Sequence, residues 1–312
     1  MEQLGAPPLA AALENRPALT RLTERVLAHW PDHLAHTEER FRGLDRAHLD
    51  FCERVSRNIA AITGHDPDRY ARNYRWTCDR MLEEEYRFHL TGEYRYTSFA
   101  EVRAGIALET GYMTRYTDGL LLSQIYWVNQ TRALQTYVER FLPALRPGNT
   151  LLEVGPGHGL LLALAAERPG VRVTGWDVSA SSLANTADAL ERMGVRTARL
   201  EHRNLHDPGT AESFDAVVAS ELLEHVDEPD EAVRRLRGLT RPGGRLFINI
   251  PVNSPAPDHI NLWRTPEEVH AYLRDGGLRI LGAEVFPMTG YTEREARDNR
   301  ATLSCALVCE PA

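Results

Sequence analysis

Residues 149–161 read Asn-Thr-Leu-Leu-Glu-Val-Gly-Pro-Gly-His-Gly-Leu-Leu, and this stretch decides the fold. The apolar run at 151–154 is typical of a buried strand, and Gly155, Gly157 and Gly159 follow it. The leucine and alanine density after the last glycine predicts a helix. A strand, a glycine-rich turn and a helix in this order let the backbone approach a ligand closely and present unpaired N–H groups to it. We therefore expect a ligand-binding cradle at this turn.

The charge and spacing of the cradle indicate which ligand it takes. Glu153 stands at the end of the predicted strand, where its carboxylate faces the cradle. A carboxylate repels a pyrophosphate but suits a cationic ligand. The glycine spacing also departs from the Gly-x-Gly-x-x-Gly pattern of dinucleotide sites. Both features favour a positively charged ligand, and a tight turn without any ligand is the alternative for this stretch taken alone.

Length and composition bound the class of protein. A chain of 312 residues, with 43% hydrophobic and 26% charged residues, is typical of a soluble globular protein with one large domain or two ordinary ones. The net charge of −8 disfavours nucleic acid as a partner, since phosphate binding needs a basic face. No signal peptide is evident, and no apolar run approaches the roughly 18 residues that span a bilayer. We expect a cytoplasmic protein that binds neither nucleic acid nor membrane.

Cysteine and histidine spacing predicts neither disulfides nor a metal. Four cysteines are not a disulfide framework in a chain of this length. Cys305 and Cys309 share a predicted strand and lie about 13 Å apart at 3.3 Å per residue, which is too far to bridge. Three histidines of the first helices have helical spacing but no accompanying carboxylate–histidine constellation, so we expect no metal site.

The first half, residues 1–146, reads as helix nearly throughout. A loop is expected at 64–68, where Pro67 starts the next helix, and another at 91–93. A long helix is expected from about 117 to 145, ended by Pro-Gly.

Four tyrosines of this half are candidates for substrate contact. Most aromatic residues here are expected to be helix-packing core. Tyr94, Tyr96, Tyr112 and Tyr116 differ because they lie near predicted helix breaks. Amphipathic rings at such positions suit a lid over an aromatic or extended apolar ligand.

The second half, residues 147–312, alternates strand and helix patterns, which predicts a mostly parallel sheet with helices on both faces. Strands are expected at 151–154, 171–176, 197–202, 214–219, 245–250, 278–286 and 302–310. The last two have no predicted helix between them, which indicates an antiparallel hairpin at the edge of the sheet.

Several residues at strand ends extend the predicted ligand site. Asp177 follows the second strand, where a carboxylate accepts both hydroxyls of a ribose. Asn204 and Leu205, after the third strand, suit the edge and face of an adenine. Ser220-Glu221 lies at the carboxyl edge of the sheet, where open α/β proteins bind ligands. The candidate ligand contacts beyond the cradle are Asp177, Val178, Asn204, Leu205, Ser220 and Glu221.

Four motifs in register, spread over residues 149–310, resemble those of class I S-adenosylmethionine-dependent methyltransferases. They are Leu-Leu-Glu-Val-Gly-Pro-Gly-His-Gly, Gly-Trp-Asp, Phe-Asp-Ala-Val-Val-Ala-Ser-Glu-Leu-Leu-Glu-His-Val and Arg-Pro-Gly-Gly-Arg-Leu. The resemblance implies a Rossmann-like seven-stranded sheet with an antiparallel last strand, and S-adenosylmethionine as cofactor, released as S-adenosylhomocysteine.

The same resemblance assigns roles to residues. It implies that Glu153 and the glycines face the methionine part, Asp177 the ribose, and Asn204 with Leu205 the adenine. The family usually has Asp where Asn204 stands. The helical first half resembles the lid, substrate-binding and dimerisation domains of methyltransferases that act on small specialised metabolites, which implies a homo-oligomer.

Methyl transfer is an in-line displacement, so the protein's main task is to align nucleophile, carbon and sulfur in a dry pocket. For a phenol, amine or activated ring carbon a base also removes a proton. His259 is the first candidate, because it follows the fifth strand on a proline-shaped loop with Asp258 adjacent. His225, in Leu-Glu-His-Val, is the second, with a structural role as the alternative.

The leading hypothesis is an enzyme of natural-product biosynthesis that methylates O, N or C of a small, aromatic metabolite. An NAD(P)-linked oxidoreductase is an alternative that Glu153 and the glycine spacing disfavour. A second alternative is a cofactor-binding accessory or regulatory subunit without turnover, in which the aromatic first half is a protein interface.

Overall fold

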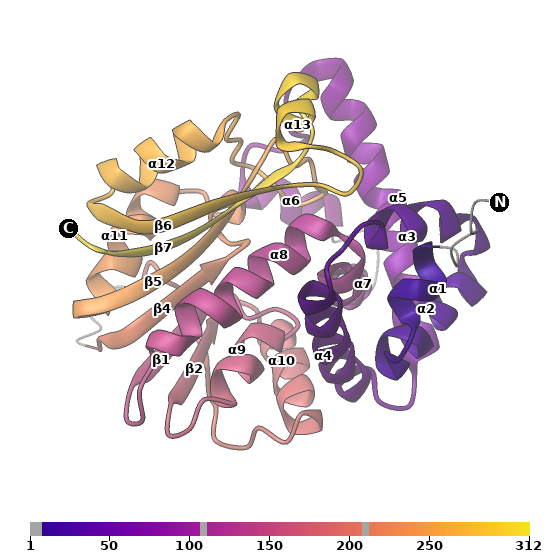
Figure 1. Cartoon of the computed structure of the whole chain (residues 1–312). Helices are drawn as coiled ribbons and strands as arrows, with labels where there is room; N and C mark the ends of the chain where they lie inside the picture. Colours follow the sequence, from indigo (N-terminus) through magenta and orange to yellow (C-terminus); the bar gives the residue numbers. More distant parts are fainter. Residues whose placement is uncertain (1–7, 107–110, 208–211) are drawn as a thin grey trace.

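The computed structural model describes residues 8–106, 111–207 and 212–312. Most of the N-terminal helices gather at one side of the sheet, and the last of them runs across a face of the sheet (Figure 1). They are α1 (Pro8–Leu13), α2 (Pro17–His29), α3 (Leu34–Phe41), α4 (Arg46–Thr63), α5 (Pro67–Thr91), α6 (Phe99–Ile106), α7 (Tyr112–Tyr126) and α8 (Val128–Thr136). Helix α5 has the predicted ends: Asp66 accepts the Arg69 N–H, Pro67 occupies the first turn, and Gly92 closes the helix with a left-handed backbone.

The predicted single helix over 117–145 is wrong. The backbone is extended at Trp127, which separates α7 from α8. The carbonyl groups freed at the end of α7 accept hydrogen bonds from Thr131, Arg40 and His36 at 2.8, 2.8 and 3.1 Å. Two of these donors lie far away in the sequence, and neither proline nor glycine marks the break. Tertiary hydrogen bonds therefore fix a bend that local sequence does not announce.

The described residues form a seven-stranded sheet in the order β3-β2-β1-β4-β5-β7-β6, in which β7 is antiparallel to both neighbours. This confirms the predicted Rossmann-like α/β fold. The strands are β1 (Thr150–Val154), β2 (Arg172–Asp177), β3 (Arg199–His202), β4 (Phe214–Ser220), β5 (Thr240–Val252), β6 (Leu278–Pro287) and β7 (Leu303–Pro311). The helices among them are α9 (Leu160–Ala166), α10 (Ala180–Arg192), α11 (Pro229–Leu239) and α12 (Pro266–Asp275).

The predicted edge hairpin needs two corrections. A short helix, α13 (Glu293–Asn299), lies between β6 and β7, where no helix was predicted. Thr292 and Glu295 form a capping box that starts it, a signal that the sequence carries. In addition, β7 inserts between β5 and β6, so only β6 lies at the edge.

The sheet is covered on both faces because alternate residues of each strand point to opposite sides. On one face, Phe247 and Val308 join a cluster with the N-terminal helices, α9 and α10. On the other, Ile248 and Leu307 join a second cluster with α11 and α12. This is the arrangement that the alternating strand and helix patterns predict.

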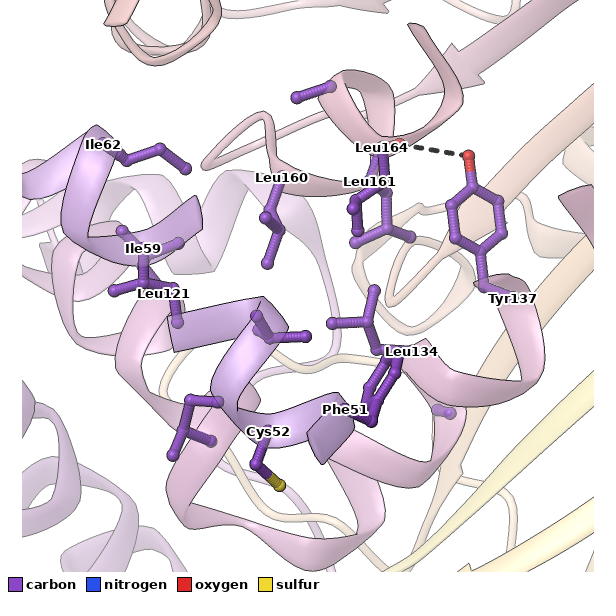
Figure 2. Close-up of a cluster of buried hydrophobic side chains, with 14 of the residues drawn as sticks. Phe51, Cys52, Ile59, Ile62, Leu121, Leu134, Tyr137, Leu160, Leu161 and Leu164 are labelled. Carbon is purple, nitrogen blue, oxygen red and sulfur yellow. Dashed lines mark hydrogen bonds between the residues drawn. The ribbon is translucent and has the colours of Figure 1, made fainter. Parts of the chain in front are cut away.

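The helical half and the sheet share the first of these clusters. Leu121 of α7 and Leu134 of α8 lie in the same cluster as Leu160 and Leu161 of α9 (Figure 2). The Tyr137 hydroxyl donates to the Leu161 carbonyl at 3.1 Å. Burial of each such leucine contributes about 1.5–3 kcal/mol. The predicted division at residue 147 falls just before β1, yet apolar packing is continuous across it.

Candidate active site

A cavity of about 250 Å³ lies where the carboxyl ends of the parallel strands meet the helical half. Its walls come from the β1–α9 turn, the ends of β4 and β5, and helices α5, α7 and α8. The candidate residues that line it are Glu153, Gly155, Gly157, Ser220, Glu221, His225, His259 and Tyr116. Those outside its lining are Gly159, Asp177, Val178, Asn204, Leu205, Asp258, Tyr94, Tyr96 and Tyr112.

The glycines of the cradle are required by its backbone. Gly155 and Gly159 have φ of 71° and 74°, a region that side chains rarely adopt. A Cβ at Gly155 would lie 3.2 Å from Leu222, and one at Gly159 would lie 3.3 Å from Thr186. A larger residue would therefore strain the backbone and crowd the turn.

Glu153 presents an unsatisfied carboxylate to the cavity. The side chain is buried, and its Oε2 has no hydrogen-bond partner in the described part of the chain. Burial raises the pKa of Glu153 to about 8. A buried acceptor of this kind is costly unless a ligand pairs with it. The cradle thus fits the positive end of a sulfonium amino acid.

Asp177, the predicted ribose contact, lies at the end of β2 and already accepts two hydrogen bonds. They come from the Ser179 N–H at 2.8 Å and the Ser182 hydroxyl at 2.7 Å, both at the start of α10. The neighbouring Val178 side chain is exposed. These contacts hold the carboxylate in a fixed direction, and the ribose role stays a prediction.

The two predicted adenine contacts differ in burial. Asn204 is exposed, and its Oδ1 accepts the His206 N–H at 2.9 Å in a local turn. Leu205 is buried within the cluster beneath α11. The adenine assignment of this pair stays a prediction.

Replacing Asp177 with Ala is expected to raise the Kd for S-adenosylmethionine about 10- to 100-fold, because a charged acceptor contributes about 1.5–3 kcal/mol. Calorimetric titration measures the change, and kcat at saturating cofactor should stay nearly constant. Asp188→Ala, an exposed change on α10 whose partner is Arg192, is the control. An unchanged Kd in Asp177→Ala would place the ribose elsewhere.

His225 and His259 lie against each other at the cavity wall, with ring centroids 4.8 Å apart in an edge-to-face arrangement. The His259 Nδ1–H donates to the Ser254 carbonyl at 2.6 Å, which leaves Nε2 as an acceptor. The His225 Nδ1–H donates to the Asp258 carbonyl at 3.0 Å. Burial, with the adjacent His225, lowers the pKa of His259 to about 3, so its ring is neutral.

The Asp258 carboxylate, adjacent to His259 in sequence, points instead toward His225 and Tyr116. Its Oδ2 lies 3.6 Å from the His225 Nδ1, and its Oδ1 accepts the Tyr116 hydroxyl at 3.1 Å. Adjacency in sequence does not indicate these two contacts, and the catalytic role of Asp258 stays a prediction.

Two more acids surround this group. Glu221 has a left-handed backbone with φ of 52° and accepts the Asn249 side-chain amide at 2.7 Å. Such a conformation is strained for a residue with a side chain, and strain of this kind gathers at functional sites. Glu224 is fully buried, and neither of its carboxylate oxygens has a hydrogen-bond partner among the described residues. Burial raises the pKa of both carboxyls.

The four candidate tyrosines divide into two pairs. Tyr116 donates to Asp258, and the Tyr94 hydroxyl accepts the Ser254 N–H at 3.0 Å. This pair holds the loop that carries His259. Tyr112 packs edge-on against Trp76 with centroids 4.8 Å apart, and the Tyr96 hydroxyl lies over Gly105 of α6. The second pair therefore packs within the helical half.

Replacing Tyr116 with Phe is expected to lower kcat about tenfold while cofactor affinity is retained, because Asp258 loses a hydrogen bond that fixes the His259 loop. Steady-state kinetics and calorimetry give the two quantities. Tyr96→Phe, outside the cavity lining, is the control. A loss of cofactor binding as large as the loss of kcat would contradict this positioning role.

Glu224, His225 and His259 place possible ligand atoms within 4.8 Å of one another, a spacing that could hold a metal ion. The sequence predicted no metal, and that prediction is untested.

Some lining residues were not predicted. Asn249 is a polar residue inside the apolar strand Leu-Phe-Ile-Asn-Ile-Pro, which is a signal that could have found it. Gln124, Asn129 and Gln130 line the cavity on the two sides of the break at Trp127, and no local signal marks them.

The sheet order, the glycine cradle with its buried acid and the cavity at the carboxyl edge together define the class of S-adenosylmethionine-dependent methyltransferases. A family model described as "Methyltransferase domain" matches residues 126–281, and the chain belongs to this family. The match begins in the helical half, at the last residue of α7. When bound, S-adenosylmethionine supplies a methyl group that its sulfonium charge activates.

Curated relatives share this domain. Ubiquinone biosynthesis O-methyltransferase of Xanthomonas campestris pv. campestris (strain B100) is 34% identical over 187 residues, 52% of this chain and 77% of the relative. The protein of the same name from Pseudomonas paraeruginosa (strain DSM 24068 / PA7) is 30% identical over 168 residues, 46% of this chain and 71% of the relative.

Solved structures share the fold. An O-methyltransferase family protein from Burkholderia thailandensis has a TM-score of 0.54 at 16% identity, over 80% of this chain and 74% of its own. Mitomycin 7-O-methyltransferase MmcR has a TM-score of 0.51 at 17% identity, over 81% of this chain and 73% of its own. No helix in the described ranges is long and apolar enough to cross a membrane.

Proposed function

We propose that this methyltransferase acts on a nucleophile, most simply a hydroxyl, of a small aromatic metabolite in natural-product biosynthesis in the cytoplasm. The observation that carries the proposal is that the free Nε2 of His259 and the Glu153 cradle face one cavity. The curated relatives are named as O-methyltransferases, which supports oxygen as the acceptor atom.

The proposed chemistry uses the neutral His259 ring. Its Nε2 accepts a hydrogen bond from the acceptor hydroxyl and orients the oxygen lone pair toward the methyl carbon. Bound S-adenosylmethionine would supply the methyl group and leave as S-adenosylhomocysteine. The hydroxyl proton becomes strongly acidic as the oxygen takes up the methyl group, so it can pass to the weakly basic Nε2 and on to solvent. Apolar and aromatic lining residues support an aromatic acceptor. They are Met81, Tyr116, Leu120, Trp127 and Met288.

A turnover screen tests the proposal. The full-length protein is incubated with S-adenosylmethionine and a panel of phenols, catechols, indoles and aromatic amines, and S-adenosylhomocysteine and methylated products are measured by mass spectrometry. Methylated product from an aromatic hydroxyl is the expected result. Tight cofactor binding with no product from any class would favour the accessory-subunit alternative.

We also infer a homo-oligomer with a contact on α5. Leu82, Tyr86 and Leu90 follow one another at helical spacing and are 64, 69 and 70% exposed. A row of large apolar side chains on one exposed helix face is a common feature of protein interfaces.

A Leu82→Arg/Leu90→Arg double variant is therefore expected to lower the oligomeric state to monomer, because two charges in an apolar contact lose their hydration. Light scattering after size-exclusion chromatography measures the mass. Leu281→Arg, an exposed change on β6, is the control. A wild-type protein that is already monomeric would refute the oligomer.

A further inference from the structure

The cavity has acids but, among the described residues, no arginine in its lining. This is notable because the chain contains 36 basic residues and all are arginine. Three carboxylates line the cavity from three different elements: Glu85 on α5, Glu153 on β1 and Glu221 after β4. An anionic ligand would therefore meet carboxyl groups and no arginine in the described part of the lining.

Buried histidines do not supply the missing positive charge. Burial lowers the pKa of His36, of His158 to about 4 and of His259 to about 3. These three lining rings are therefore neutral in neutral solution.

Among the lining acids, burial raises the pKa of Glu153 to about 8 and of Glu221 to about 7, whereas the Glu85 side chain is 35% exposed on the helical wall. Glu85 is therefore the lining acid from which the charge argument follows.

The unpartnered buried side-chain atoms of the lining residues also favour a cationic ligand. In the described ranges these atoms are the Oε2 of Glu153 and the Oδ1 of Asn249, on residues that are 3% and 1% exposed. The Asn249 Oδ1 is an acceptor, and the Glu153 carboxyl becomes one when a bound cation favours its ionised form. The cavity therefore requires ligands that bring hydrogen-bond donors or positive charge.

The cofactor accounts for only part of this requirement. Its sulfonium and ammonium groups outweigh its one carboxylate and match Glu153 at the cradle. Glu85 lies on the helical wall, and its partner His89 is 3.8 Å away at the next turn of the same helix, a loose contact. Glu85 thus offers a carboxylate to a second ligand that enters beside the cofactor.

We propose that the methyl acceptor carries a protonated amino group in addition to the atom that is methylated, and that Glu85 pairs with this ammonium. The inference rests on the proposed function for the existence of an aromatic acceptor, and it adds the charge of that acceptor. Acceptors with a carboxylate or phosphate group are disfavoured, because Glu85 repels them and no arginine lines the described part of the cavity.

Three catechols of matched shape test the charge preference: dopamine, 4-ethylcatechol and 3-(3,4-dihydroxyphenyl)propanoate. Each is titrated calorimetrically into the protein saturated with S-adenosylhomocysteine, and kcat/KM is measured with S-adenosylmethionine. The amine is expected to bind about tenfold or more tighter than the acid, with the neutral compound between them. Binding of the acid as tight as that of the amine, or no binding of the amine, overturns the inference.

Two variants assign the effect to one residue. Glu85→Gln is expected to reduce the advantage of the amine over 4-ethylcatechol about fivefold, as a partly exposed ion pair is lost. Glu83→Gln is the control, since Glu83 pairs with Arg80 and does not line the cavity. Equal effects of the two variants contradict a role for Glu85.

The binding measurement separates this inference from the proposed function. If no catechol is methylated but the amine still binds best and loses its advantage in Glu85→Gln, the charge preference holds and the proposed reaction fails. If catechols are methylated with the acid as the best substrate, the reaction holds and the charge preference fails.

Discussion

Replacing Glu153 with Gln is expected to raise the Kd for S-adenosylmethionine about 10- to 100-fold, since a charged hydrogen-bond acceptor contributes about 1.5–3 kcal/mol. The carboxylate is buried in the cradle with an unpartnered oxygen, and the cofactor supplies the positive group that would satisfy it. Calorimetric titration of both proteins gives the two Kd values. Glu191→Gln, an exposed change on α10, serves as the control.

The same carboxyl group makes cofactor binding depend on pH. Its pKa is about 8 in the ligand-free protein, so it is mostly protonated at pH 7, and a bound cation favours the ionised form. Binding should therefore release up to about one proton at pH 7 and strengthen as pH rises toward 8. Titrations in buffers of different ionisation enthalpy measure that proton, and its absence from wild type would contradict the pairing.

The stability of the ligand-free protein changes with pH in the opposite direction to cofactor binding. The folded pKa of Glu153 is raised from 4.5 to about 8, so the folded protein binds more protons than the unfolded chain between these values. Its free energy of unfolding therefore falls as pH rises from about 4.5 to 8. Ligand-free Glu153→Gln lacks this fall and is expected to be about 1–3 kcal/mol more stable than wild type at pH 8. Denaturant unfolding at pH 5 and pH 8 checks the difference, which should be small at pH 5.

Replacing His259 with Ala is expected to lower kcat about 100-fold while cofactor affinity stays nearly intact, the lower end of the range for a general base because its pKa lies well below neutral pH. Its Nε2 is a free acceptor in the cavity, fixed by the bond from Nδ1 to Ser254. Because its pKa is about 3, this group should cause no loss of kcat between pH 8 and pH 6. Steady-state kinetics over that range measures both effects.

His65→Ala, in the exposed loop before α5, is the control for this substitution. A large loss of cofactor binding in His259→Ala would mean that the ring supports the cradle instead of the acceptor. Retention of full kcat would remove His259 from the reaction.

Local signals predicted most of the fold. Ser179 caps α10 and Thr265 caps α12 through bonds to N–H groups three residues on, and the glycine turn after β1 is where the sequence predicts it. These features depend on residues within a few positions of one another. The break at Trp127 depends on Arg40, which lies 85 residues from the carbonyl it binds, and periodicity alone does not contain that contact.

The candidate site also contains residues that the sequence could predict and pairings that it could not. Glu153 lies near the end of β1 and Glu221 follows β4, and the topology of a parallel sheet brings such residues to one edge. The bond from Tyr116 to Asp258 joins residues 142 positions apart, and the contact between the His225 and His259 rings crosses from one loop to another. Pairings of this kind require the folded chain, which is why the partner of Asp258 was not predicted.

The apolar packing of α7 and α8 against α9 also limits how this enzyme can be divided or recombined. A fragment beginning at residue 147 would leave Leu160 and Leu161 without the side chains that cover them, and would be prone to aggregation when expressed alone. For the same reason, exchange of the N-terminal helices with those of a relative would have to preserve that buried contact. Acceptor preference is therefore better engineered by point substitutions on the cavity walls than by transplanting whole segments.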